Sequence, residues 1–467
     1  MLRPWLPLPS IIVLAACGQS GAFSEKGVKD PEIAAPALAT VALVDAAPTT
    51  PPASMAAVGP LDNASALKHW FERLATLDDG GSNQDVRVVQ FGDSHTAADL
   101  ESGTVRRSLQ ARFGDGGRGF VELGRPWKTY IQDGLKLPGM NKDWSAEHGK
   151  LEHGRFVGDG CYGIGGVCLV TNKKGAKAWA DIVSPSSNVE LEYLEQPQGG
   201  TLELFVDNTS ALKVSTKGKA NASAFKAVSV PDGPHHLEVQ ALGDGDVRFF
   251  GVSLDRNQIG VVWNALGING ARASTLLQWS EPHMADQIQH QAPDLVVLAY
   301  GTNESADDGS LEAFERQLVD VLGRVARAVP SASCLLLGPP DRAIETSTGW
   351  MTAPKLEQVV EVERAVAHAA GCGFYDQLKA MGGNGTIAAW AEETPPRAQK
   401  DHVHLTRDGY TFVGQAFADD LVRAYAAWRA DKGMTPARAP TPRVPNTAPE
   451  NHDDKPPANS PFVAIPM

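Results

Sequence analysis

The segment Val86-Arg-Val-Val-Gln-Phe91, followed by Gly92-Asp-Ser-His-Thr96, decides how this sequence folds. A short run rich in β-branched and aromatic residues predicts a buried strand, and the glycine marks its end. Ser94 then stands where a helix begins, and the first main-chain N–H groups of a helix have no partner within it. Because most serines at such turns only cap a helix, Ser94 needs partners elsewhere in the sequence before a reaction can be assigned to it.

Those partners stand near the end of the chain, in Asp401-His-Val-His404. A serine nucleophile needs a base that takes its proton and an acid that orients the base. Ser94, His404 and Asp401 would fill these three roles. His402 is an alternative base. In the alternative without catalysis, Ser94 caps a helix, and Asp401 and His404 only begin one.

Strand and helix patterns alternate through much of the chain. Further strands are predicted at 259–263, 295–300, 334–337 and 374–376, and helices at 97–113, 274–291, 311–329, 356–370 and 409–428. This alternation predicts an α/β fold, in which a parallel sheet lies between two layers of helices. For five strands we expect the flavodoxin-like order 2-1-3-4-5, which brings the loops after the first three strands together at one edge.

The interval 121–256 breaks this rhythm. Runs such as Thr201-Leu-Glu-Leu-Phe-Val206 alternate with a period of two and are separated by glycine-containing turns. This pattern is typical of an antiparallel β-sandwich. We therefore predict an inserted β-domain at 121–256 and an α/β domain made of residues 61–120 and 257–430.

The N-terminus predicts export. Residues 1–17 form a signal segment that ends in Ala15-Ala-Cys17 and resembles a bacterial lipobox, in which the cysteine is lipidated. Cleavage near Ala16 as an ordinary signal peptide is the alternative. Residues 18–60, rich in Ala and Pro, predict a disordered tether, and residues 431–467 a disordered, proline-rich tail. We expect a periplasmic lipoprotein of the cell envelope, anchored to the outer membrane through Cys17.

Composition narrows the possible partners and cofactors. The chain has 467 residues, of which 42% are hydrophobic and 21% charged, so it has material for more than one globular domain. A net charge of −13 argues against nucleic acid as a partner. No run of 18 or more apolar residues predicts a membrane span. No Cys/His spacing resembles a zinc site, and we predict neither a metal nor a cofactor.

Four cysteines remain after Cys17. Cys334 and Cys372 each begin an apolar run, so neighbouring parallel strands would bring their sulfur atoms to one end of the sheet. Cys161 and Cys168 flank a glycine-rich turn. An exported chain permits disulfides in both pairs, and four buried free thiols are the alternative.

The loops after the second and third strands complete a site for acyl transfer. They contain Gly267-Ile-Asn-Gly270 and Gly301-Thr-Asn303. The tetrahedral intermediate of acyl transfer carries an oxyanion that needs preorganised donors. The backbone N–H groups of Ser94 and Gly270 and the side-chain amide of Asn303 are the candidates.

These blocks resemble the SGNH (GDSL) hydrolase superfamily: Gly92-Asp-Ser94, Gly270, Gly301-x-Asn303 and Asp401-x-x-His404 occur in the family's order. Gly92-Asp-Ser-His-Thr96, with Arg112-Phe-Gly-Asp-Gly-Gly-Arg-Gly-Phe120, is more narrowly similar to bacterial peptidoglycan O-acetylesterases. That resemblance implies a carbohydrate-binding-module-like insert, Ser94 as nucleophile, His404 as base and Asp401 as its orienting acid.

The resulting hypothesis is an envelope esterase that removes O-acetyl groups from peptidoglycan or another acetylated polysaccharide through an acetyl-serine. A polysaccharide O-acetyltransferase with the same triad, and a non-catalytic wall-binding lipoprotein, are the alternatives. Three further residues stay open. Glu304 is either structural or substrate-positioning, Trp350 either packs or stacks on a sugar, and His95 is expected in a turn or facing substrate.

Overall fold

The structure is a computed structural model in which residues 57–149 and 158–435 are described. Cys17, the rest of the predicted signal segment, and nearly all of the predicted tether and tail lie outside these ranges. Among the described residues, no helix has both the length and the apolar character that crossing a bilayer requires.

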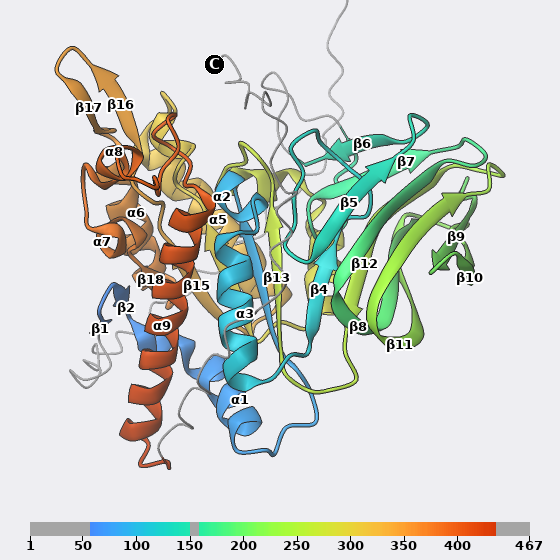
Figure 1. Cartoon of the computed structure of the whole chain (residues 1–467), viewed down its shortest axis with the longest axis horizontal. Helices are drawn as coiled ribbons and strands as arrows, with labels where there is room; N and C mark the ends of the chain where they lie inside the picture. Colours follow the sequence, from blue (N-terminus) through green and yellow to red (C-terminus); the bar gives the residue numbers. More distant parts are fainter. Residues whose placement is uncertain (1–56, 150–157, 436–467) are drawn as a thin grey trace, which may run out of the picture. The chain divides into compact units, whose positions relative to one another are not determined.

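A mostly parallel sheet forms the centre of the α/β fold (Figure 1). Its parallel strands lie in the order β13 (Val261–Gly267), β3 (Val86–Gly92), β14 (Leu295–Ala299), β15 (Ser333–Leu337) and β18 (Gly373–Tyr375). Numbered along the chain, this order is 2-1-3-4-5. The short strands β2 (Leu61–Asp62) and β1 (Ala57–Val58) extend the β18 edge in antiparallel fashion. The predicted α/β class and parallel sheet are confirmed.

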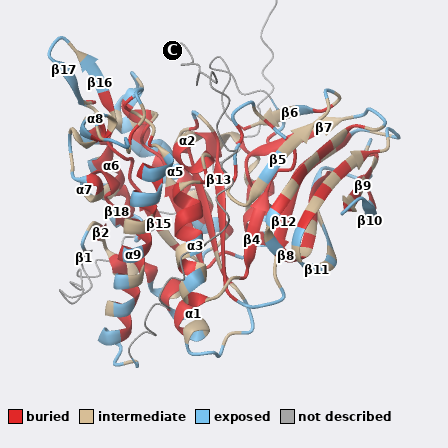
Figure 2. Ribbon diagram, viewed as in Figure 1, coloured by how far each residue is buried: buried red, intermediate tan, exposed pale blue. Residues whose placement is uncertain are grey.

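Helices cover both faces of this sheet because successive strand residues point to opposite sides. Val88 packs in a cluster with α1 (Lys68–Asp78), α3 (Glu101–Phe113) and α9 (Arg407–Asp431). Val89 packs in the other cluster, with α4 (Glu281–Gln291), α5 (Leu311–Ala328) and α6 (Leu356–Ala369). The buried sheet between two helical layers is visible in Figure 2. Shorter elements complete this part: η2 (Ala64–Leu67), α2 (Ser94–Ala97), η3 (Ala273–Gln278), η4 (Glu304–Ala306), β16 (Ala343–Thr346), β17 (Gly349–Thr352), α7 (Gln377–Met381) and α8 (Thr386–Ala391).

The predicted helix 97–113 is interrupted near its start. Asp99 has a φ of 45°, in the left-handed region, and separates α2 from α3. Its fully buried carboxylate contacts Arg106 and Arg118, at 3.3 and 2.6 Å. These paired charges hold a backbone conformation that a non-glycine residue adopts only at some cost.

The inserted region is an antiparallel sheet. Its strands are β4 (Gly117–Val121), β5 (Leu135–Met140), β6 (Ser145–His148), β7 (Val167–Thr171), β8 (Lys177–Glu195), β9 (Thr201–Val206), β10 (Thr209–Ser215), β11 (Ala222–Ala241) and β12 (Val247–Asp255). The sheet begins at Gly117, ahead of the predicted boundary at residue 121. Its backbone pairing connects all nine strands, and the division into the two packed sheets of a sandwich stays a prediction.

One of the two suggested cysteine pairs forms. Cys334 and Cys372 make a disulfide between the starts of the neighbouring strands β15 and β18, as their positions indicated. The suggested Cys161–Cys168 pair is wrong, since both are free and buried. Cys168 faces Glu147 across the β6–β7 pairing, with its sulfur 3.9 Å from a carboxylate oxygen.

Replacing both Cys334 and Cys372 by Ser should lower the free energy of unfolding by roughly 2–4 kcal/mol, because the crosslink restricts the unfolded chain. Urea unfolding monitored by circular dichroism measures the change. Reductant should lower the urea midpoint of the wild type and leave that of the double variant unchanged. Equal midpoints for the two proteins without reductant would contradict a stabilising disulfide.

Candidate active site

Ser94 lies where β3 gives way to a helix at the carboxyl edge of the sheet. It is the first residue of α2, and the Asp93 side chain accepts a hydrogen bond of 2.9 Å from the His95 amide. Gly92 makes the turn possible, because a Cβ there would come within 2.8 Å of the Ala299 carbonyl oxygen. The amide of Ser94 has no acceptor within its own helix, so the turn leaves both its hydroxyl and its N–H available.

The structure brings Ser94, His404 and Asp401 together. His404 Nε2 is 3.0 Å from Ser94 Oγ, and His404 Nδ1 is 2.7 Å from Asp401 Oδ2. Asp401 Oδ1 also accepts the amide hydrogens of Val403 and His404, each at 3.0 Å. The contacts form a continuous path from the serine hydroxyl through the imidazole to the carboxylate.

The electrostatics of Asp401 set the tautomer of His404. Partial burial raises the pKa of Asp401, but hydrogen bonds from the His404 side chain and from two backbone amides outweigh it and lower the pKa to about 2. The carboxylate is therefore ionised at neutral pH and takes the hydrogen of Nδ1. Nε2 is left with its lone pair toward Ser94, which is the arrangement a general base needs.

The candidate oxyanion donors lie in neighbouring loops. Gly270 follows β13 and has a φ of 74°, while Asn303 follows β14 and is the N-cap residue directly before η4. Asn303 Nδ2 donates a hydrogen bond of 2.8 Å to the Ala271 carbonyl, which ties these two loops together. Because an amide nitrogen carries two hydrogens, Asn303 keeps a second one for another acceptor.

Glu304 acts within the scaffold. It is buried, and its two carboxylate oxygens accept from the amides of Ala273 at 2.8 Å and Gly301 at 3.0 Å. Through these bonds Glu304, the residue after Asn303, ties the loop after β14 to the loop after β13. The structure thus supports the first of the two roles left open for Glu304, a structural one.

The two other histidines considered for the site do not contact Ser94 Oγ as His404 does. His95, expected in a turn or facing substrate, lies in the short helix α2 and is buried, with its Nδ1 2.9 Å from the Tyr410 hydroxyl. Burial lowers the pKa of His95 to about 3, and the ring is neutral at physiological pH. His402 is also buried, with its ring stacked against Trp350.

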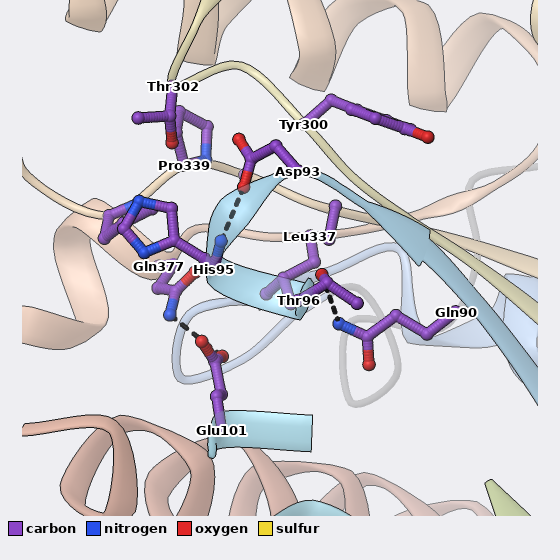
Figure 3. A pocket seen from close by; sticks show the side chains of 13 residues that line it. Gln90, Asp93, His95, Thr96, Glu101, Tyr300, Thr302, Leu337, Pro339 and Gln377 are labelled. Atoms are coloured by element: carbon purple, nitrogen blue, oxygen red, sulfur yellow. Dashed lines mark hydrogen bonds between the residues drawn. The ribbon is translucent and has the colours of Figure 1, made fainter. Parts of the chain in front are cut away.

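A small cavity is lined by Asp93, His95 and Thr96, on either side of Ser94 in the sequence (Figure 3). Its volume is about 10 Å³, which suits about one water molecule. Asp93, His95, Glu101, Thr302 and Gln377 are among the residues that line it. Glu101 accepts a hydrogen bond of 2.9 Å from Gln377, and burial raises its pKa to about 7. The sequence carried no signal for Glu101, whereas Thr302 lies inside the Gly301–Asn303 motif.

Comparisons with known proteins agree with this geometry. Residues 233–412 match the model of the GDSL-like Lipase/Acylhydrolase family. This segment contains Gly270, Asn303, Asp401 and His404, while Ser94 lies before it. The comparison with curated proteins found no match. The chain contains a GDSL-like acylhydrolase domain and is an SGNH-type esterase.

The similarity to one solved structure extends over most of the chain. A peptidoglycan O-acetylesterase is 25% identical, with a TM-score of 0.65, and the match covers 79% of this chain and 99% of that one. An acetyl xylan esterase is 21% identical over 35% of this chain and 81% of its own, with a TM-score of 0.27. The first of these structures therefore provides a structural comparison for most of this chain.

Replacing Glu101 by Gln should stabilise the protein at pH 8 more than at pH 4.5. The pKa of Glu101 in the folded protein, about 7, lies above the usual value. The contribution of protonated Glu101 to stability is therefore complete below about pH 4.5, and it is lost as the pH rises through 7. The difference should approach about 3 kcal/mol, since each pKa unit corresponds to about 1.4 kcal/mol.

Thermal and urea unfolding at the two pH values measure this difference. Glu315→Gln, at an exposed site on α5, is the control and should change stability similarly at both. Equal effects of Glu101→Gln at pH 4.5 and pH 8 would contradict a protonated, buried Glu101.

Proposed function

We propose that this esterase removes O-acetyl groups from a cell-envelope polysaccharide, with peptidoglycan muramic acid as the substrate, through an acetyl-Ser94 intermediate. The observation that carries the proposal is the unbroken contact from Ser94 Oγ through His404 to Asp401, with distances of 3.0 and 2.7 Å. The choice of substrate is supported by the similarity to a peptidoglycan O-acetylesterase.

In the first half of the reaction, Ser94 Oγ attacks the acetyl carbonyl carbon while His404 Nε2 takes the hydroxyl proton. The carbonyl oxygen becomes an oxyanion, and the amides of Ser94 and Gly270 with the Asn303 side chain donate to it. The bond to the sugar oxygen then breaks. His404 gives its proton to that oxygen, which leaves a free sugar hydroxyl and acetyl-Ser94.

The second half repeats these steps with water as the nucleophile. His404 takes a proton from the water as its oxygen attacks the acetyl carbon, and the same donors hold the second oxyanion. The bond to Ser94 Oγ breaks, His404 returns the proton to Oγ, and acetic acid leaves and gives its proton to solvent to become acetate. Asp401 stays ionised and stabilises the imidazolium in both halves.

The predicted N-terminal anchor and domain division fit this substrate. Lipidation at Cys17 would hold the enzyme at the outer membrane, facing the periplasm where peptidoglycan lies, and the part of the predicted tether that precedes β1 would give it reach. The inserted domain at 121–256 is proposed as a carbohydrate-binding-module-like unit.

Incorporation of radiolabelled palmitate that is lost in Cys17→Ala would support the anchor, and unchanged labelling would exclude it.

Ser94→Ala should abolish acetate release from O-acetylated peptidoglycan while the circular dichroism spectrum stays that of the wild type, because the nucleophile alone is removed. Acetate is measured before and after chemical de-acetylation of the wall material. Undiminished release by Ser94→Ala would overturn the proposal. Transfer of acetyl groups to an oligosaccharide in preference to water would make the protein an acetyltransferase. Failure of a fluorophosphonate to label Ser94 would favour a non-catalytic wall-binding protein.

Asp401→Asn should lower kcat by roughly 10⁴-fold, because an amide at this position no longer selects the productive His404 tautomer; the magnitude is that of the analogous change in a serine protease. Steady-state kinetics on 4-nitrophenyl acetate measure it. Asp408→Asn is the matched control, an exposed carboxylate in the first turn of α9, and should keep wild-type kcat. Equal rates for the two variants would exclude Asp401 from the triad.

A further inference from the structure

A β-hairpin rises at the same end of the parallel sheet as Ser94. It consists of β16 and β17, which follow β15, and it projects beyond the sheet on the side where α2 begins (Figure 1). Three of its side chains are large, apolar and exposed: Ile344 at 38%, Trp350 at 41% and Met351 at 47%. Trp350 pairs with Glu345 and Met351 with Ile344, so Trp350 and Met351 point to opposite faces of the hairpin.

The base of the hairpin is fixed to its surroundings. Asp341 is fully buried and accepts hydrogen bonds from the Thr352 hydroxyl at 2.8 Å and from the Ile387 amide at 2.9 Å. The Ala343 amide donates to the His402 carbonyl at 2.9 Å. The hairpin is thereby held on the loop that carries Asp401 and His404.

Trp350 reaches back over this loop. Its ring stacks on the imidazole of His402, with centroids 3.7 Å apart and an angle of 17° between the planes. His402 is itself buried and has a φ of 53°, in the left-handed region. One face of the indole is therefore covered by His402, and the exposed area belongs to the other face and the edges.

Packing does not account for this exposed indole. Trp350 belongs to none of the four hydrophobic clusters formed by the described residues. A large apolar ring that stacks on the loop carrying Asp401 and His404, and that leaves part of its surface exposed, has the form of a binding surface. The C–H groups of a pyranose ring carry partial positive charge and pack on the electron-rich face of an aromatic ring.

We propose that Trp350 is a stacking platform for a sugar ring of the glycan chain whose acetyl ester is held at Ser94. The proposal rests on the proposed function and extends it, since it assigns the contact by which the enzyme recognises a polymer. The platform contributes to binding of the chain and takes no part in the chemistry at the acetyl group.

Trp350→Ala should raise the apparent KM for O-acetylated peptidoglycan roughly tenfold, the loss expected for one aromatic stacking contact, and leave kcat/KM for 4-nitrophenyl acetate unchanged. Trp350→Phe should restore most of the affinity. Met351→Ala, next in sequence and on the opposite face, is the control and should behave as the wild type on both substrates.

Two results would overturn the platform. Unchanged kinetics of Trp350→Ala on both substrates would mean that the ring contacts no substrate. An equal loss on the polymer and on 4-nitrophenyl acetate would mean that Trp350 only supports the loop of Asp401 and His404.

A binding assay distinguishes the proposed stacking role of Trp350 from the proposed esterase function. Insoluble peptidoglycan should retain Ser94→Ala better than Ser94→Ala/Trp350→Ala, whether or not the wild type releases acetate from it. Equal retention of the two variants would count against the platform, whereas absence of acetate release by the wild type would count against the proposed function alone.

Discussion

The contact between His404 Nε2 and Ser94 Oγ, 3.0 Å long, is the constraint on which the rest of the site depends. It joins residues separated by 310 positions in the chain, so no local structure can make it. The parallel sheet does so by ending β3, β13 and β14 at one edge, while α9 begins directly after the loop that carries His404. Glu304 and Asn303 then lock the loops between these elements.

Much of this arrangement was predictable because its signals are local. Apolar runs that alternate with helical patterns indicate a parallel sheet. Residues at the carboxyl ends of neighbouring parallel strands lie close together, so their proximity can be predicted before any contact is known. The same reasoning placed Cys334 beside Cys372, at the starts of adjacent strands. The triad could be predicted from the order of its sequence motifs along the chain and from the chemistry that a serine nucleophile requires.

What escaped prediction depends on burial and on distant contacts. Asp99 breaks the expected helix because Arg106 and Arg118 surround its carboxylate, and the arginine on β4 could not be placed beside it from sequence spacing. The raised pKa of Glu101 results from burial of its carboxyl group, and the periodicity of the sequence does not reveal that burial. The stack of Trp350 on His402 likewise requires the hairpin to fold back over the triad loop.

In the proposed mechanism, Ser94 carries the acetyl group between the two halves of the reaction. Mass spectrometry of the enzyme, quenched with acid during turnover of 4-nitrophenyl acetate and digested, tests it most directly. We expect a single added acetyl group on the peptide that contains Ser94, and no such group in Ser94→Ala. Turnover without an acetylated Ser94 peptide, or with the acetyl group on another residue, would contradict it.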